Sequence, residues 1–203
     1  MVRVLIADPH TVARLGYAAA LAATPGLELV GQADRAGGAR PLVVTVQPDV
    51  VLLDADLPDV DGLTFGESLR SARPNLGLVL VGPPSDDMLF RALEERFSAY
   101  LPRSASLDVM MSAVRHAAAA PTSFTAPDLA VALGRRRAVS SALSPREAQV
   151  LRHLYVGSNN ASIADKMHLT ESTVRTYLAR VYDKLGVRSR AEALVAATQR
   201  GLL

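Results

Sequence analysis

Charged side chains stand directly after several short apolar runs in the first half of the chain. Asp8, Asp54 and Asp56 come at or just beyond the end of such a run, and Arg103 follows the last of them. Carboxylate oxygens are the ligands that Mg²⁺ prefers, and a guanidinium pairs with carboxylates and phosphates through a planar set of N–H donors. Brought together, these side chains form a pocket that suits a cation or a phosphoryl group.

A second set of polar residues lies near the C-terminus with the spacing of one helix face. Val174, Leu178, Val181 and Leu185 recur every three or four residues and predict a buried stripe. The opposite side carries arginine and threonine, which can read guanine and thymine edges in the major groove of DNA. An ordinary solvated amphipathic helix explains the spacing and the charge equally well. The candidate DNA-binding residues are Thr170, Ser172, Thr173, Arg175, Thr176, Ala179, Arg180, Lys184, Arg188 and Arg190. Of these, the last three are expected to contact phosphates.

Five short apolar runs and the helical stretches between them predict the framework of residues 1–120. The runs are rich in Val, Ile and Leu, which is typical of strands buried on both faces of a parallel sheet. Between them apolar residues recur with helical spacing, as at Val12, Leu15, Ala19 and Ala22. This alternation predicts an α/β domain with a doubly wound, five-stranded parallel sheet, whose functional crevice lies at the carboxyl ends of the strands. The expected strands are Val2–Ala7, Leu27–Ala33, Val50–Leu53, Leu78–Val81 and Ala99–Leu101.

Residues 142–203 predict a separate, all-α domain. Ser144, Pro145 and Glu147 form a strong helix start, with serine as the N-cap and glutamate at the third helical position. Two short helices joined by a tight turn, the second carrying basic and hydroxyl residues, predict a helix-turn-helix. Residues 121–141 are expected to be a linker with a short helix. The expected helices of the domain run from Pro145 to Gly157, over 160–167, over 171–185 and over 190–200.

The composition agrees with two globular domains and excludes several classes of protein. Of the 203 residues, 49% are hydrophobic, which is enough to form cores rather than a disordered chain. The absence of cysteine excludes disulfides and thiolate metal sites, and the scattered His10, His116, His153 and His168 predict no metal site. No signal-peptide pattern or membrane-spanning apolar run is found, so a cytoplasmic protein without membrane contact is expected. An acidic first half and a basic C-terminal part favour an input domain joined to a nucleic-acid-binding domain.

The C-terminal segment carries specific motifs at Leu143–Glu147, Asn159–Ala164, Leu169–Tyr177 and Lys184–Arg190. Over nearly all of residues 143–203 the chain therefore resembles the LuxR-type helix-turn-helix domain. The resemblance implies that the helix over 171–185 reads the major groove and that the last helix makes a dimer contact. The family usually has Lys and His where this chain has Arg175 and Tyr177. Ala179 stands where some relatives carry a basic residue that reads a base.

The first half carries a matching set of motifs at Asp8, Pro48–Asp54, Asp61–Gly62 and Tyr100. Residues 1–119 resemble the flavodoxin-like receiver domain of response regulators, and the whole chain resembles the NarL/FixJ family. The resemblance implies that Asp54 accepts a phosphoryl group from a histidine kinase, with Mg²⁺ held beside it.

Three positions depart from the receiver pattern. Pro9 replaces the second residue of the acidic pair, Gly82 replaces a Ser or Thr, and Arg103 replaces a Lys. Arginine keeps the positive charge but is not equivalent to lysine where a point charge is needed. Without its hydroxyl partner, the switch residue Tyr100 is expected to be merely half-buried. The predicted pocket around Asp54 consists of Asp8, Pro9, Asp56, Gly82, Tyr100 and Arg103.

The lost carboxylate weakens any magnesium site in this pocket. We expect either no metal or a weak Mg²⁺ site at Asp8 and Asp54, and no other cofactor. Asp56 and Asp59 are alternative sources of a replacement metal ligand, although loop residues beyond the acceptor are more often solvated.

These features predict a sequence-specific DNA-binding transcription regulator, an atypical response regulator that acts without conventional phosphorylation. The alternative is a conventional response regulator that a histidine kinase activates at Asp54. An enzyme is not expected, because the chain has no nucleophile elbow, phosphate loop or metal motif. A scaffold that binds protein instead of DNA is a further alternative. The expected partners are double-stranded DNA, a second copy of the chain, and a small molecule or protein at the altered receiver pocket.

Overall fold

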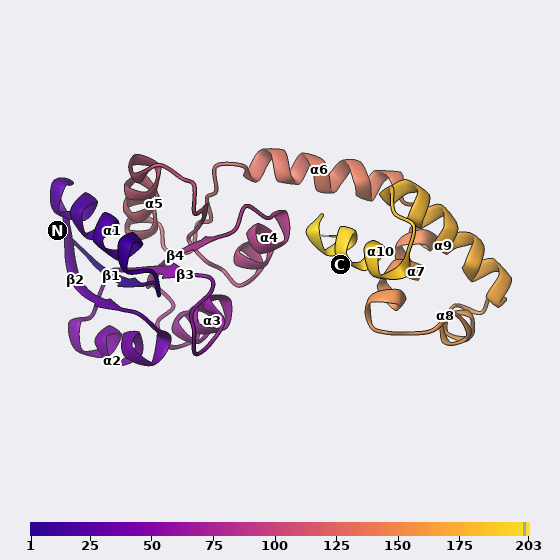
Figure 1. The fold of residues 1–203 in the computed structure, drawn as a ribbon, viewed down its shortest axis with the longest axis horizontal. Helices are drawn as coiled ribbons and strands as arrows, with labels where there is room; N and C mark the ends of the chain where they lie inside the picture. The colour runs from indigo at the N-terminus through magenta and orange to yellow at the C-terminus, as the bar shows by residue number, and fades with distance from the viewer. Residues whose placement is uncertain (201) are drawn as a thin grey trace. The chain divides into compact units, whose positions relative to one another are not determined.

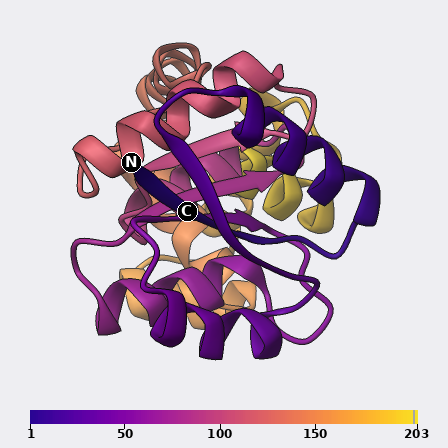
Figure 2. The same ribbon diagram turned by 90° about the vertical axis from the view of Figure 1, so that its left-hand side faces the viewer.

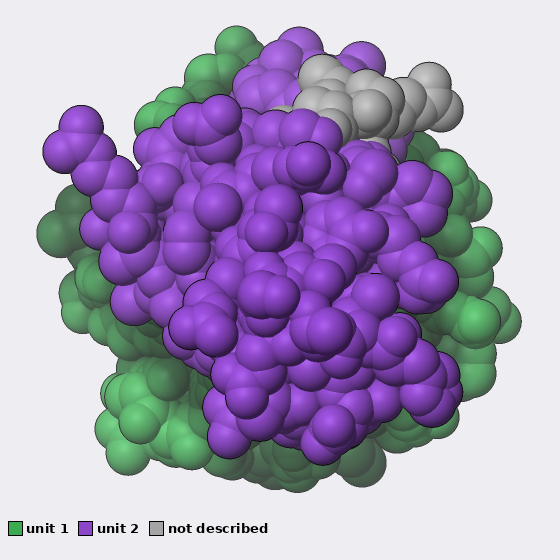
Figure 3. All heavy atoms as spheres, turned by 90° about the vertical axis from the view of Figure 1, so that its right-hand side faces the viewer, with its two compact units in different colours: residues 1–127 green, residues 128–203 purple. Residues whose placement is uncertain are grey.

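The computed structural model describes residues 1–200 and 202–203, and for 137–142 it describes the backbone alone. The chain divides into two compact units, Met1–Pro127 and Asp128–Leu203, which Figure 3 shows in different colours. As predicted, the first unit contains both strands and helices, and the described part of the second unit contains helices alone (Figure 1). Within the described residues, no helix is long and apolar enough to cross a membrane.

The first unit is built on one parallel sheet with the strand order β2-β1-β3-β4-β5. All five strands coincide with the predicted apolar runs to within a residue or two, so the predicted fold class is confirmed. The elements of this unit are β1 (Val2–Ala7), α1 (Thr11–Ala23), β2 (Leu27–Ala33), α2 (Ala36–Val46), β3 (Val50–Asp54), α3 (Gly62–Ala72), β4 (Gly77–Gly82), α4 (Asp86–Glu94), β5 (Ala99–Pro102) and α5 (Leu107–Ala119).

Helices cover both faces of this sheet, as Figure 2 shows for α1 and α5 on one side and α2 and α3 on the other. Every residue of β3 and β4 is buried, which explains why these strands read as continuous apolar runs. On the α1 and α5 side, Tyr17, Leu21, Met110 and Val114 pack against Ile6 and its neighbours in the sheet.

The face of α1 that the sequence singled out lies on the solvent side of the helix. Val12 is 83% exposed and Leu15 is 64% exposed, whereas Tyr17 and Leu21 face the core. The helix is apolar around most of its circumference, so helical spacing alone does not distinguish its buried face from its exposed one.

The strand order places the carboxyl ends of β1 and β3 side by side. The chain continues from β1 to β2 on one side of this pair and from β3 to β4 on the other side. Ligands of open α/β sheets bind at such a switch point. Asp54 is the last residue of β3 and Asp8 follows β1 directly. The topology therefore brings two residues that are 46 positions apart in sequence to one crevice.

A short segment beyond α5 adds to the outer edge of β5. Thr125 forms a parallel bridge with Ala99. Its carbonyl oxygen accepts a hydrogen bond of 3.1 Å from the Tyr100 amide, and its amide donates one of 3.0 Å to the Ser98 carbonyl. The Ser98 hydroxyl, which is fully buried, donates to the Pro121 carbonyl at 2.6 Å. These contacts tie the segment over 121–127 to the first unit.

The second unit is a group of helices around one apolar core. Val150, Ile163, Val174, Leu178 and Val181 are buried in this core, which α7, α8, α9 and α10 share. Its elements are α6 (Leu129–Ala142), α7 (Pro145–Tyr155), α8 (Asn160–Met167), α9 (Glu171–Leu185) and α10 (Arg190–Gln199).

Side-chain caps define the helix starts in this unit. Asn159, Thr170 and Ser189 each accept an amide hydrogen bond at the beginning of α8, α9 and α10 respectively. Ser144 and Glu147 form a complete capping box at α7. Gly186 ends α9 with a φ of 68°, in the left-handed region that glycine tolerates.

The linker region is more helical than the sequence suggested. We expected a short helix within 121–141, but α6 runs from Leu129 to Ala142. Its backbone therefore continues as a helix through Gly134 and the residues that follow it, because an isolated glycine is tolerated within a helix. The side chains of 137–142 lie outside the described residues.

Candidate functional site

Arg103 and Asp54 form a bidentate ion pair at the centre of the pocket predicted around Asp54. The Nε and one terminal nitrogen of Arg103 donate to the two carboxylate oxygens of Asp54 at 3.1 and 2.8 Å. The same terminal nitrogen donates to Asp56 at 2.6 Å. The Asp54 side chain is 1% exposed and that of Arg103 is 36% exposed. The hydrogen bonds that Arg103 donates to Asp54 raise the pKa of Arg103, so its guanidinium stays charged.

Asp8 lies beside this pair and is bonded to His10. Its Oδ1 accepts the His10 amide at 2.7 Å and also lies 3.0 Å from Nδ1 of the His10 ring. Burial raises the pKa of Asp8, and the nearby negative charge of Asp54 adds to that effect, although the hydrogen bonds from His10 oppose it. The pocket thus holds two buried carboxylates close together.

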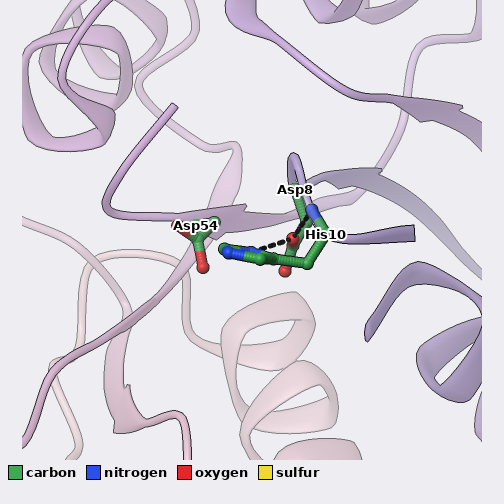
Figure 4. A group of neighbouring side chains, drawn as sticks. All are labelled: Asp8, His10 and Asp54. Atoms are coloured by element: carbon green, nitrogen blue, oxygen red, sulfur yellow. Dashed lines mark hydrogen bonds and ion pairs between the residues drawn. The ribbon is translucent and has the colours of Figure 1, made fainter. Parts of the chain in front are cut away.

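The structure also places His10 among the pocket residues, which the sequence reasoning missed. Asp8, His10 and Asp54 each offer one ligand atom, and these atoms lie within 4.8 Å of one another (Figure 4). His10 is the N-cap of α1 and its side chain is 59% exposed. The spacing of Asp8 and His10, two residues apart at the end of a strand, was the available signal.

The Mg²⁺ ion that the resemblance implies is a poor match to these groups. Mg²⁺ requires near-octahedral oxygen ligands, but Pro9 supplies no carboxylate and Arg103 already holds both oxygens of Asp54. The neighbouring donor is an imidazole rather than an oxygen. A weak Mg²⁺ site at Asp8 and Asp54 stays a prediction.

Tyr100 is buried rather than half-buried, so that expectation was wrong. It is 3% exposed, and its hydroxyl donates a hydrogen bond to the carbonyl of Pro83. Burial raises the pKa of Tyr100 to about 12. A Cβ atom at Gly82 would lie 3.3 Å from Cε2 of the Tyr100 ring and 3.2 Å from Ala55 Cβ. The Tyr100 ring can pack this closely against residue 82 because glycine has no side chain.

Replacing Gly82 with threonine is expected to displace Tyr100 from this position. The added Cβ already makes close contacts, and the threonine methyl and hydroxyl need further room. The measurement is nitration by tetranitromethane, located by peptide mass spectrometry. Tyr100 should resist modification in the wild type and react in Gly82→Thr. Equal protection in both proteins would show that the ring keeps its place, and Gly16→Ala, where a Cβ meets nothing within 4 Å, serves as the control.

The two loop aspartates differ in what they contact. Asp56 pairs with Arg103, although its side chain is 67% exposed. Asp59 accepts the backbone amides of Ala36 and Gly37 at 2.9 and 2.7 Å, and these hydrogen bonds lower its pKa. Asp59 therefore stabilises the first turn of α2 instead of supplying a ligand to the pocket.

Helix α9 presents the predicted polar face to solvent. Its buried stripe consists of Val174, Leu178, Val181 and Leu185, as the spacing predicted. The exposed side carries a residue set suited to base edges in the major groove. The exposed members of that set are Ser172, Arg175, Thr176, Ala179 and Arg180.

The hydroxyls at the start of α9 organise its N-terminus. Thr170 caps the helix by accepting the amide of Thr173 at 3.2 Å, and its Oγ1 also bonds to the hydroxyls of Ser172 and Thr173. The Thr176 hydroxyl donates to the carbonyl of Ser172. A shallow groove lies alongside, where α8 meets α9, and it is lined in part by Asn160, Arg175 and Ala179.

Three basic residues that were expected at phosphates have different surroundings. Lys184 donates to the buried carboxylate of Glu147 at 2.6 Å. Arg190 donates to the carbonyls of Leu154 and Ser158 at 3.1 and 3.0 Å. The side chain of Arg188 is exposed and makes no hydrogen bond or ion pair with the other described residues. Lys184 and Arg190 thus stabilise the unit, and their contact with DNA stays a prediction.

Both halves of the chain match known families. Residues 4–115 match the family described as Response regulator receiver domain, and residues 141–197 match Bacterial regulatory proteins, luxR family. Each match lies within one of the two structural units.

Individual proteins match over the full length. The chain is 32% identical to the Probable transcriptional regulatory protein NarL of Mycobacterium tuberculosis, over 100% of this chain and 96% of that protein. It is also 32% identical to the DNA-binding transcriptional activator DevR/DosR of the same species, over 98% of this chain and 95% of that protein. The solved structure of the response regulator ChrA, from a heme-sensing two-component system, has 30% identity and a TM-score of 0.54, covering 100% of this chain and 98% of ChrA.

Proposed function

The chain belongs to the NarL/FixJ family of DNA-binding transcriptional response regulators, and we propose that its receiver departs from that family by acting without conventional phosphorylation of Asp54. The relatives that match it are transcription regulators and not enzymes, which agrees with the function expected from the sequence. The proposal concerns how the receiver controls the regulator, because DNA binding by the C-terminal unit already follows from the family.

The observation that carries the proposal is the ion pair between Asp54 and Arg103. A phosphoryl group can only be transferred to a carboxylate oxygen that is free to attack, and transfer depends on positioning and charge neutralisation. Here both oxygens of Asp54 accept hydrogen bonds from one guanidinium, and Oδ1 also accepts the amide of Asp56 at 2.8 Å. Pro9 and Gly82 supply neither the second carboxylate nor the hydroxyl that the reaction uses.

The buried Tyr100 supports the same proposal. Its ring fills the space beside Gly82, and its hydroxyl is bonded to a backbone carbonyl of the same loop. Gly82 has no hydroxyl that could hydrogen-bond to a phosphoryl group on Asp54. The arrangement of this loop is therefore independent of phosphate.

At the output, we propose that α9 enters the major groove and that a homodimer binds two half-sites about one helical turn apart, ~10 bp. Arg175, Thr176, Ala179 and Arg180 are the proposed contacts to bases and backbone on its exposed side. A sequence-specific site of this kind would be recognised through a few side chains at base edges, while phosphate contacts fix the position of the helix.

Intact mass after incubation with Mg²⁺ and acetyl phosphate tests the proposal directly. The wild-type protein is expected to keep its mass, because Arg103 holds Asp54 and the other pocket groups are missing. A variant with Pro9→Asp, Gly82→Thr and Arg103→Lys restores the groups that the family pattern contains. This restored variant is expected to gain one phosphoryl group.

The control is the restored variant that also carries Asp54→Ala, which should gain nothing. Phosphorylation of the wild type at Asp54 would contradict the proposal and would establish the conventional mode. Phosphorylation of the restored variant alone would support it, because the chemistry would then depend on the three replaced residues.

A further inference from the structure

We propose that the groove between α5 and the segment over 121–127 is a binding site for a small amphipathic cation, an amine or amidine carried on a flat apolar body. The groove lies in the first unit and shares no residue with the pocket around Asp54. The inference therefore goes beyond the proposed function, because it adds a ligand site at a different place in the receiver.

The groove has the size of a small-molecule site. Its volume is about 530 Å³, and pockets that hold small molecules commonly measure roughly 300–1,000 Å³. One wall is α5, and the other is formed by residues 125–127, next to the edge of β5. Backbone hydrogen bonds of Thr125 with Ser98 and Tyr100 hold this second wall in place, so the groove is formed before a ligand binds.

Part of the groove is apolar. Leu101 of β5 and Ala113 of α5 line it and are buried, whereas the Val109 side chain lines it and is 40% exposed. Pro127 completes this apolar lining from the other wall. An apolar ligand body placed here would remove the exposed surface of Val109 from water, which favours binding.

Three polar residues of α5 form a row along the same groove. Asp108, Ser112 and His116 follow one another every four residues, and side chains at that spacing lie on one side of a helix. Val109 and Ala113 form a neighbouring row with the same spacing. The α5 wall thus presents a polar stripe beside an apolar one, which matches a ligand with one polar and one apolar side.

The polar stripe offers hydrogen-bond acceptors. The Ser112 hydroxyl donates to the backbone carbonyl of Asp108 at 2.8 Å, which leaves its oxygen lone pairs for another donor. Nε2 of His116 lies 2.9 Å from the carbonyl oxygen of Ser123. A carbonyl only accepts, so Nε2 carries the proton and Nδ1 of the neutral ring is an acceptor. A ligand that satisfies this stripe needs N–H donors.

The carboxylate of Asp108 determines the charge of the ligand. Asp108 is exposed in the first turn of α5, and no described residue donates a hydrogen bond to its side chain or forms an ion pair with it. An amidinium can pair with a carboxylate through two parallel N–H donors, as a guanidinium does. An anionic ligand would instead be repelled.

A cation bound in the groove would join two parts of the receiver. It would contact α5 on one side and, on the other, the residues that directly precede Asp128, where the second unit begins. The ligand should therefore stabilise the pairing of Thr125 with β5. Hydrogen exchange of the Thr125 amide, which donates to the Ser98 carbonyl, reports this effect.

Amide NMR titration of the full-length protein with 2-naphthamidine and with 2-naphthoate tests the inference. The two probes have nearly the same shape and opposite charge. We expect 2-naphthamidine to shift the amide signals of Ala113 and Thr125 saturably, with a Kd of about 1 mM or below for a fragment of this size. 2-Naphthoate should bind at least about tenfold more weakly. Bound 2-naphthamidine should also slow the exchange of the Thr125 amide.

Three variants locate the site, and thermal melting checks that each one folds. Asp108→Asn keeps the shape of the groove but removes the charge, so it should weaken 2-naphthamidine binding by about three- to tenfold. Ser112→Trp places an indole in the groove from an exposed helix position and should abolish binding. Glu28→Gln removes another exposed acid, on β2 at the opposite edge of the sheet, and should bind the probe as the wild type does.

Equal binding of the two probes, shifts that avoid the groove, or wild-type affinity in both Asp108→Asn and Ser112→Trp would overturn the inference. The absence of saturable shifts in the wild type would overturn it as well. A smaller sedimentation mass of Ser112→Trp would then assign the groove to a contact between two copies of the chain. The result is separate from that of the phosphorylation experiment, because a wild type that is phosphorylated at Asp54 would still retain this site.

Discussion

Replacing Glu147 with alanine is expected to destabilise the C-terminal unit by about 2–3 kcal/mol. Glu147 is 3% exposed and accepts hydrogen bonds from the Lys184 ammonium at 2.6 Å and the Ser144 amide at 2.7 Å. Removing the carboxylate leaves the charge of Lys184 without its partner and breaks the capping box of α7. The loss stays below the ~3–5 kcal/mol of a fully buried pair because the Lys184 side chain is 35% exposed and regains water.

Amide hydrogen exchange of peptides from α7 and α9 in the full-length protein measures this effect. Exchange should become roughly 30 to 150 times faster in Glu147→Ala, the equivalent of that free energy. The matched control is Glu192→Ala. Glu192 holds the same third position in α10, after the N-cap Ser189, and accepts the Arg188 amide at 2.9 Å, but it is exposed. A cost in Glu192→Ala as large as in Glu147→Ala would show that the cap, and not the buried ion pair, carries the stability.

The stabilisation by Glu147 should also depend on pH in one direction. Burial alone would raise the pKa of Glu147, but the hydrogen bonds from Lys184 and Ser144 outweigh it and lower the pKa. A carboxyl with a lowered folded-state pKa stabilises fully above its unfolded pKa of about 4.3, and the stabilisation is lost as the pH falls toward the folded value. The difference between wild type and Glu147→Ala should therefore shrink below about pH 4.

Replacing Arg175 with alanine is expected to weaken binding to the protein's DNA site by about 5- to 150-fold, or roughly 1–3 kcal/mol. Arg175 is exposed on the face of α9 opposite its buried stripe and lines the groove beside α8. A guanidinium placed there can bind guanine with two parallel hydrogen bonds. The site would be selected by the wild-type protein from random duplexes, and affinities measured by fluorescence anisotropy at several salt concentrations.

The salt dependence distinguishes a base contact from a phosphate contact. Loss of a base contact should relax the preference at one position and leave the salt slope unchanged, whereas loss of a phosphate contact should reduce the slope by about one. Arg146→Ala is the control, because Arg146 is also exposed but lies on α7 and bonds to Gln149. Equal affinity of Arg175→Ala and wild type would exclude α9 residue 175 from the interface.

Local signals in the sequence were sufficient to predict most of the secondary structure. Strands β3 and β4 are buried on both faces, so continuous apolar runs identified them. In the C-terminal unit the capping residues Ser144, Thr170 and Ser189 fix the helix starts, and the predicted starts coincide with the observed ones. The buried stripe of α9 was likewise predicted, because its opposite face is polar.

The contacts within the sites depend on tertiary structure and were harder to foresee. Almost every position of α1 is apolar, so the spacing of its apolar residues is consistent with more than one buried face. The packing against the sheet shows that Tyr17 and Leu21 face the core. Arg103 and Asp54 are 49 positions apart, and their positions after two strands placed them in one predicted pocket, but the sequence did not indicate that Arg103 donates to both oxygens of Asp54. The ion pair of Lys184 with the buried Glu147 is a further contact that the charge pattern of the sequence did not indicate.

The outer edge of β5 determines where the chain can be truncated to give an isolated receiver. A terminal strand with unpaired backbone groups invites pairing with another molecule. The bridge between Ala99 and Thr125 covers part of that edge, and the Pro121 carbonyl accepts the buried Ser98 hydroxyl. A fragment that stops at residue 120 would uncover the strand and leave the Ser98 hydroxyl without this acceptor. Such a fragment would be prone to aggregate, so an isolated receiver should extend to Pro127.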